Sequence, residues 1–300
     1  MDIRARIDEI RSLALFRHFP EAKLEELARV LSVRAAPAGA VVFEEDSAGD
    51  ALFLVSEGQV RIEKRIEAGR VAELALLSPG DLFGEMALIE RAPRSARAVA
   101  QTDVTLLVLG RGDLVRWLGA EPQTALEFFV ELLRVLSHRL RRSSNDLVLL
   151  FDLSQLTLQR FDDETGFLQA VLQHVVPHLE GEWSAAAFLY NEFNDEVSRV
   201  GTEGPRGESL SQTLPLGETA SRWLDAASFC VALRGRAATP LGFLVARNET
   251  AMGPREQGEV EVALTAAGHL VASALQNIRH DAEERLRARL QQRQTDDSPL

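Results

Sequence analysis

The stretch FGEMALIERAPRSARAV, residues 83–99, decides how the first half of the chain folds. Gly80 and Gly84 let the backbone turn sharply and approach a ligand closely. Between them and the next proline, the apolar residues 86–89 can form one short helical turn. Because the first N–H groups of a helix have no partner within it, such a turn attracts an anion.

Three polar side chains complete the pocket that this stretch predicts. Arg94 can offer two parallel donors to phosphate oxygens, and Ser95 a further hydrogen bond. Glu85, close to that cation, can accept from a sugar hydroxyl. An isolated Gly-Glu or Pro-Arg dipeptide usually marks an ordinary surface loop, so the indication lies in the whole string, which favours a site for one phosphate and one ribose.

The surrounding pattern places this string in a small β structure. From Gly39 to Leu109, short apolar runs alternate with turn residues, which predicts a β-roll or barrel. Residues 3–33 have helical periodicity with a break near Pro20, and a second apolar periodicity predicts a long helix from Pro122 to about residue 150. The polar residues 143–146 keep that period, so we expect a helical connection to the second half.

Residues 83–99 and the strands before them resemble the phosphate-binding cassette of cyclic-nucleotide-binding domains. These domains occur in regulatory subunits of cAMP-dependent kinase, in cyclic-nucleotide-gated channels and in Crp/Fnr regulators. The resemblance implies a ribose contact by Gly84 and Glu85, a cyclic-phosphate contact by Arg94, and further ligand contacts in the same cassette by Met86, Ala87, Ser95 and Ala96. Gly58 and Gly80 match turn glycines of the family, whereas Glu45 stands where a glycine is common.

The segment HRLRRSSNDL, residues 138–147, resembles the end of the dimerising helix of catabolite-activator regulators. That resemblance implies adenine contacts by Ser143 and Ser144, one to the ligand of the same subunit and one to that of a partner. The alternative is that a Ser-Ser pair simply ends a helix. Ser95 leaves the choice between cAMP and cGMP open, because related cGMP-binding domains use a hydroxyl there.

The second half predicts a different module. A helix at 162–179, four strand-like segments and a helix at 257–294 give an α+β pattern. Through ATPLGFLVARN, residues 238–248, and the helical segment 264–278, it resembles a GAF domain, a small-molecule sensory module. The chain is thus expected to be α+β, with a cyclic-nucleotide-binding domain and dimerising helix at 12–150, a GAF-like domain at 151–281 and a polar helical tail at 282–300.

Several chemistries find no support in the sequence. The single cysteine, Cys230, lies in a strand-like FCVAL context and is expected in the core, and the histidines show no metal-ligand spacing. With 45 acidic and 33 basic residues, the net charge of −12 opposes nonspecific binding to nucleic acid or anionic membranes. We found no catalytic motif, no helix-turn-helix after residue 150 and no membrane-spanning or signal segment.

The sequence therefore predicts a cytoplasmic, non-enzymatic sensor of cAMP, with cGMP possible and no metal. It is expected to form a homodimer through residues 122–150 and the C-terminal helix, to act on an unknown protein partner, and not to bind DNA directly. Two alternatives stay open. One is an interaction module with a vestigial nucleotide pocket, and the other is the sensory part of a signalling enzyme.

Overall fold

The computed structural model describes residues 3–66, 70–90, 92–119, 121–191, 194–210, 220–235 and 240–296. The chain forms two compact units, each described here by itself. The first comprises Met1–Arg142 and Pro254–Val262, and the second Ser143–Gly253 and Ala263–Leu300. The first unit is therefore built from two parts of the chain, because residues 254–262 join the N-terminal part that reaches Arg142. The sequence predicted a domain limit at residue 150.

The N-terminal helical region of the first unit is divided into short elements. They are α1 (Ile3–Ser12), the 3₁₀ turn η1 (Ala14–Phe16) and α2 (Glu21–Val30). Pro20 immediately precedes α2, where its missing N–H costs no helical hydrogen bond. The predicted break near Pro20 is confirmed, while the helical segment ends at Val30 rather than at residue 33.

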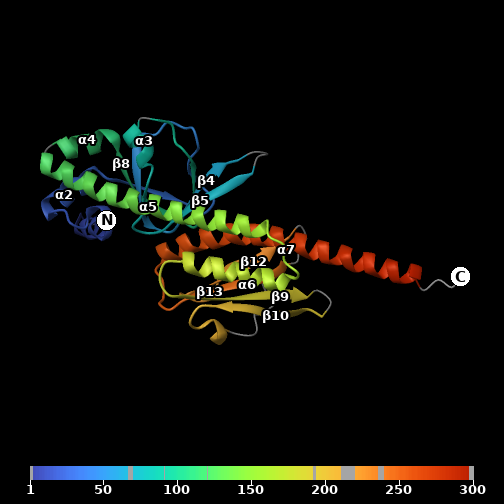
Figure 1. Ribbon diagram of the computed structural model, residues 1–300. Coiled ribbons are helices and arrows are strands. Elements are labelled where there is room, and N and C mark those ends of the chain that lie inside the picture. The colour runs from blue at the N-terminus through green and yellow to red at the C-terminus, as the bar shows by residue number, and fades with distance from the viewer. Residues whose placement is uncertain are drawn as a thin grey trace. The chain divides into compact units, whose positions relative to one another are not determined.

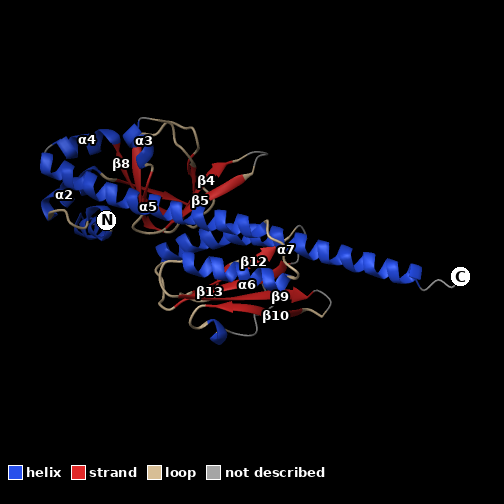
Figure 2. Ribbon diagram, viewed as in Figure 1, coloured by secondary structure: helices blue, strands red, loops and turns tan. Residues whose placement is uncertain are grey.

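Two four-stranded antiparallel sheets form the predicted β-roll of the first unit (Figure 2). One has the order β1-β8-β3-β6 and the other β2-β7-β4-β5. The first sheet contains β1 (Ser32–Ala36), β8 (Val104–Gly110), β3 (Ala51–Glu57) and β6 (Leu82–Phe83), and the second β2 (Val41–Phe43), β7 (Arg97–Ala100), β4 (Val60–Arg65) and β5 (Val71–Leu77). Strands β1 and β7 were not predicted from the apolar runs. Val60, Ala98 and Leu106 meet in a buried core built from both sheets.

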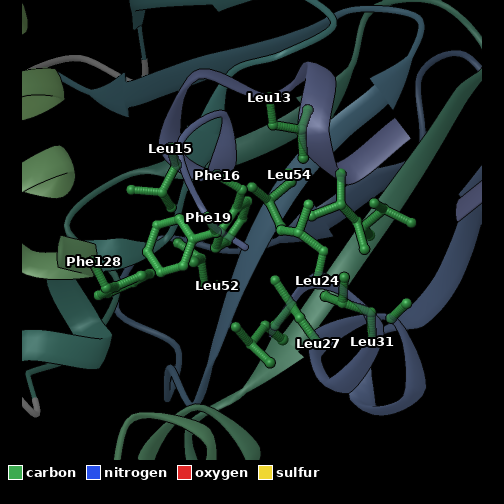
Figure 3. Close-up of a cluster of buried hydrophobic side chains, with 14 of the residues drawn as sticks. Leu13, Leu15, Phe16, Phe19, Leu24, Leu27, Leu31, Leu52, Leu54 and Phe128 are labelled. Carbon is green, nitrogen blue, oxygen red and sulfur yellow. The ribbon is translucent and has the colours of Figure 1, made fainter. Parts of the chain in front are cut away.

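A second core joins the helices to the β-roll. Helices α2, α4 (Arg111–Gly119) and the first turns of α5 (Pro122–Thr157) lie together in Figure 1. Figure 3 shows Phe16, Phe19 and Phe128 side by side within this cluster, with Leu52 and Leu54 of β3 among them. The Phe16 ring centroid lies 5.8 Å from that of Phe19 and 6.2 Å from that of Phe128. Such aromatic contacts fix the helices against the sheet that carries the cassette.

Helix α5 is longer than predicted. It runs without interruption from Pro122 to Thr157, seven residues beyond the predicted end, so the connection between the two halves is helical as expected. Asn145 and Asp146 do not end it, because helix-disfavouring residues are tolerated inside a long helix with many apolar neighbours.

The second unit is an antiparallel sheet with helices. It contains α6 (Glu164–Val175), the 3₁₀ turn η3 (Val176–His178), β9 (Trp183–Asn191), β10 (Glu196–Glu203), the 3₁₀ turn η4 (Gly207–Ser209), β11 (Arg222–Trp223), β12 (Ser228–Arg234), β13 (Pro240–Asn248) and most of α7 (Pro254–Asp296). The sheet order is β10-β9-β13-β12-β11. The four predicted strands and both helices are confirmed. Among the described elements, the two-residue β11 and the 3₁₀ turn η4 were missed.

Three details of this unit bear on the sequence predictions. Cys230 lies on β12 with 2% of its surface exposed, as predicted. Helix α7 begins three residues earlier than expected and passes position 282 without a break, so the predicted tail is part of it as far as Asp296. Residues 238 and 239 of the segment that suggested the GAF-like module, and residues 297–300 of the tail, lie outside the described residues.

Candidate functional site

Gly84 shapes the backbone of the site between β6 and α3 (Glu85–Glu90), and α3 is the predicted short helical turn. Its φ of +81° lies in the left-handed region, which favours glycine. A Cβ atom at this position would lie 2.5 Å from Nη1 of Arg94 and 3.1 Å from the carbonyl oxygen of Ala51. The absence of a side chain therefore leaves the space that the arginine occupies.

Arg94 is buried, with 4% of its surface exposed. Its Nη1 donates to the carbonyl of Gly84 and its Nη2 to that of Ala51, each at 2.9 Å. The guanidinium carbon stands 4.3 Å from the ring centroid of Phe43 and 5.4 Å from that of Phe53, within cation–π range. These contacts hold the guanidinium in one orientation below the cassette.

The electrostatics of Arg94 favour an anionic ligand. Burial lowers the pKa of this guanidinium, and the carboxylates of Asp50 and Glu85 partly offset the effect. Its Nε is buried and makes no hydrogen bond within the described part of the chain. A buried donor without an acceptor is costly, so an anion that brings oxygens to this guanidinium has a physical reason to bind.

Glu85 is the second buried charge of the site, with 7% of its surface exposed. Its Oε1 lies 3.5 Å from Nη1 of Arg139 on α5, and Nη2 of Arg139 donates to the carbonyl of Leu82. The arginine thus ties α5 to both the strand before the cassette and the first residue of α3. This carboxylate is fixed by a cation and retains acceptor capacity for a hydroxyl.

The other predicted residues of the cassette have different surroundings. Met86 and Ser95 are exposed, whereas Ala96 is buried beside Arg94 in the chain. The backbone of Ala87 belongs to α3, but its side chain lies outside the described residues. Lys64 of β4 donates from Nζ to the carbonyl of Ser95 at 3.3 Å, which supports the loop after Arg94.

The turn before β3 closes against the cassette. The N–H of Arg94 donates to Ser47 at 2.8 Å, and the N–H of Asp46 donates to the carbonyl of Arg94 at 2.9 Å. In this turn, Glu45 stands where the resemblance expects a common glycine. The residue with a left-handed φ, 62°, is Asp46, a conformation that aspartate tolerates better than most residues. Gly58 and Gly80 have left-handed φ values of 79° and 98°, as their predicted turn roles require.

Ser143 and Ser144 lie on α5, four and five residues after Arg139. They belong to the second compact unit, so the structure does not relate them to the cassette, and their adenine contacts stay a prediction. Sequence reasoning missed three residues that contact Arg94 or Glu85. Phe43 and Phe53, beside Arg94, look like ordinary strand residues. Arg139, beside Glu85, has one indication in the sequence, which is that it lies one helical turn before the two serines.

Within the described residues, no helix carries an apolar stretch of the length that a membrane crossing needs. Within the same residues, no group of three or more histidine, cysteine, aspartate or glutamate side chains is arranged to hold a metal ion.

A β-roll with a glycine turn, a short helix, a buried arginine and a buried glutamate at one site defines a cyclic-nucleotide-binding domain. Comparison with known proteins agrees, since the profile of the cyclic nucleotide-binding domain matches residues 33–120. The cyclic AMP receptor protein of Thermus thermophilus is 40% identical over 167 residues, which cover 56% of this chain and 74% of that protein. The chain therefore belongs to the family of CRP-like cyclic-nucleotide-binding proteins.

Two further relatives show the extent of the similarity. A CRP-like cAMP-activated global transcriptional regulator of Mycobacterium tuberculosis is 34% identical over 142 residues, which are 47% of this chain and 62% of that regulator. The chain therefore spans less than two thirds of this relative. The crystal structure of the Thermus thermophilus catabolite activator protein has 30% identity and a TM-score of 0.42, covering 57% of this chain and 74% of that one.

Proposed function

We propose that this protein is a non-enzymatic cAMP sensor that acts as a homodimer and passes the binding signal along α5 to a GAF-like domain. The single observation that carries the nucleotide site is the buried Arg94 guanidinium, fixed by two carbonyls and two aromatic rings and with Nε unbonded among the described residues. An arginine held in this way is suited to the cyclic phosphate.

The rest of the cassette is assigned to the nucleotide by chemistry. Glu85 would accept a hydrogen bond from the ribose 2′-hydroxyl, next to the backbone of Gly84. The backbone N–H groups at Met86 and Ala87, in the first turn of α3, would face the phosphate together with Ser95 and Ala96. The relatives named for cAMP support that nucleotide over cGMP.

The pattern of α5 supports the dimer. Leu126, Leu133, Leu140 and Leu147 recur every seven residues, and Val130 and Phe151 fall on a second seven-residue series. This is the heptad pattern of a two-stranded coiled coil. Most of these side chains are exposed, with Leu133 at 62% and Leu147 at 65%. A second copy of α5 would cover them.

The same register separates the two serines. Ser144 falls on the second series, between Val130 and Phe151, so in a coiled coil it would lie at the seam between the two subunits. Ser143 would flank that seam. We therefore assign Ser144 to the adenine of the partner subunit and Ser143 to the adenine of its own.

The second unit would serve as the receiving module. Its antiparallel sheet with α6 and α7 supports an α+β sensory domain of the GAF-like kind, acting on a protein partner in trans. The M. tuberculosis relative is named a transcriptional regulator, but the acidic second half offers no basic recognition helix here. We accordingly expect no direct binding to duplex DNA, which a salt-controlled titration would check.

Calorimetric titration with cAMP and cGMP tests the proposal. We expect cAMP to bind more tightly than cGMP, and Arg94→Ala to lose roughly 2 to 5 kcal/mol of binding free energy, the scale for removing one partner of a buried charge pair. Arg116→Ala is the matched control, because Arg116 is an exposed arginine that pairs with Asp113 of the same helix. Equal cAMP affinity in wild type and Arg94→Ala would overturn the site, and no binding by either would favour a vestigial pocket.

A further inference from the structure

The first two turns of α7 belong to the same compact unit as the cassette. Within these turns, Nε of Arg255 lies 3.1 Å from Oδ1 of Asp81 and 3.3 Å from Oε1 of Glu259. The other carboxylate oxygen of Glu259 pairs with Nη1 of Arg142 on α5. Four alternating charges therefore connect the turn before β6, the start of α7 and helix α5.

Asp81 is a rigid anchor for this chain of charges. Only 4% of its surface is exposed. Its Oδ2 accepts from the N–H of Ser78, and its own N–H donates to the carbonyl of Ser78, each at 3.0 Å. The hydroxyl of Ser78 in turn donates to the carbonyl of Pro254 at 3.2 Å. The turn that leads into the cassette thus holds the first residues of α7 at two points.

Gly258 gives independent evidence that the contact is close. A glycine inside a helix costs about 1 kcal/mol relative to alanine, so its presence in the second turn of α7 needs a reason. A Cβ atom there would lie 3.1 Å from the carbonyl oxygen of Leu76 and 3.4 Å from its Cβ. The missing side chain lets the helix backbone approach β5.

Helix α5 connects the start of α7 with the cassette through two arginines. Arg139 and Arg142 are three residues apart and so lie on one face of the helix. Arg139 holds the carbonyl of Leu82 and the carboxylate of Glu85, while Arg142 holds Glu259. Ion pairs join Asp81, Arg255, Glu259 and Arg142, and also Arg139 and Glu85, while helix α5 and the backbone of residues 81–85 connect these two sets. We call these six residues the coupling ring.

We propose that the coupling ring links nucleotide occupancy at Glu85 to the first two turns of α7, with Arg142, Arg255 and Glu259 as positioning residues. This inference rests on the proposed nucleotide site. A nucleotide that orders Glu85 and the turn at Asp81 reduces the conformational freedom of these two side chains. Their partners in the coupling ring, including Arg255 and Glu259 on α7, are then held more tightly. Because α7 continues beyond Val262 as one helix, the effect reaches the second unit along the chain.

Coupling between two sites is reciprocal, so the link can be measured both at residues 254–262 and at the nucleotide site. If nucleotide stabilises residues 254–262, then weakening the ring must weaken nucleotide binding by the same factor. We expect Glu259→Gln and Arg142→Gln each to reduce cAMP affinity about fivefold, at the lower end of typical coupling between sites. Arg142→Lys keeps the charge and should retain most of the affinity, which a purely steric role of Arg142 would not predict.

Hydrogen exchange followed by mass spectrometry provides the deciding test on the full chain. In wild type, cAMP should slow exchange of the amides at 258–262, and Glu259→Gln should abolish that response. Without nucleotide, Glu259→Gln should speed exchange at Leu82 and Phe83, at the opposite side of the coupling ring. Arg287→Gln is the control and should change neither, because Arg287 is exposed, lies farther along α7 and pairs with Glu283 of the same helix.

The outcomes separate the two proposals. If wild type binds cAMP but Glu259→Gln and Arg142→Gln match it in affinity and in both exchange measurements, the coupling ring is wrong while the nucleotide site stands. If wild type binds no cyclic nucleotide, the proposed function fails, and the exchange at Leu82 and Phe83 without nucleotide still decides whether α7 and the cassette are linked. A faster exchange there would support the linkage, and an unchanged rate would overturn it.

Discussion

The guanidinium of Arg139 lies 3.5 Å from the carboxylate of Glu85, and the two groups come from a long helix and from the first residue of the cassette helix. Both side chains are mostly buried, with exposed fractions of 29% and 10%. Arg139 also donates to the carbonyl of Leu82. A ligand hydroxyl that bonds Glu85 therefore meets a carboxylate whose position is already set by α5.

Replacing Arg139 with glutamine should weaken cAMP binding roughly tenfold, equivalent to about 1.4 kcal/mol, because Glu85 loses the cation that orients it. Calorimetry measures the change directly. Arg134→Gln is the matched control on the same helix, since Arg134 is 67% exposed and pairs with Glu131 one turn away. Wild-type affinity in Arg139→Gln would show that the pairing has no part in ligand binding.

Substitution of Gly80 and of Gly84 distinguishes the cost of a left-handed φ from the cost of steric crowding, because both have a left-handed φ but only Gly84 is crowded. Alanine in this conformation costs roughly 1 to 2 kcal/mol, so Gly80→Ala and Gly84→Ala should share that loss of stability. At Gly80 an added Cβ meets nothing within 4 Å, whereas at Gly84 it meets the Arg94 guanidinium at 2.5 Å. Gly84→Ala should therefore lose about 1 to 3 kcal/mol more and should also lose nucleotide binding. Urea unfolding and calorimetry of both variants check this, and equal effects of the two would contradict it.

The buried thiol gives a prediction for alkaline pH. Burial raises the pKa of Cys230 from 9.0 to about 11, against the opposing charge of Arg222. The folded protein therefore holds this proton more tightly than the unfolded chain, and stability is full below pH 9 and falls as the pH rises from 9 to 11. The loss should be on the order of 2 to 3 kcal/mol.

Chemical unfolding at pH 8 and at pH 11 measures that loss. Cys230→Ala is the control, because it keeps every other group that titrates in this range and lacks only the thiol. Its stability should fall less between the two pH values than that of wild type. The same fall in both proteins would show that Cys230 does not contribute.

The sequence predicted those parts of the fold that depend on local patterns. Alternating apolar runs give the strands, and a sustained apolar period gives α5 and α7. The short helix α3 and the left-handed Gly84 follow from the cassette string itself. The N-terminal helix divides at Pro20 for the local reason expected of proline.

What the sequence did not predict depends on contacts between distant residues. Phe43 and Phe53 surround Arg94 only because β2 and β3 meet in the folded β-roll. Arg255 reaches Asp81 across 174 positions of chain, and no local pattern marks either of them. The left-handed φ of Asp46 was not predicted, because aspartate, unlike glycine, gives no clear sequence indication of that conformation.

The heptad pattern of α5 predicts a dimer that one substitution can break. Leu133→Glu would place a carboxylate in each half of the proposed coiled coil, where burial of an unpaired charge is strongly unfavourable. Leu133 is 62% exposed within the chain, so its replacement should leave the fold intact while shifting the protein to monomer in sedimentation velocity. His138→Glu is the control, because it adds a carboxylate to the same exposed helix outside both apolar series. If Ser144 contacts the partner's nucleotide, the Leu133→Glu monomer should also bind cAMP more weakly, whereas a dimeric Leu133→Glu would disprove the seam.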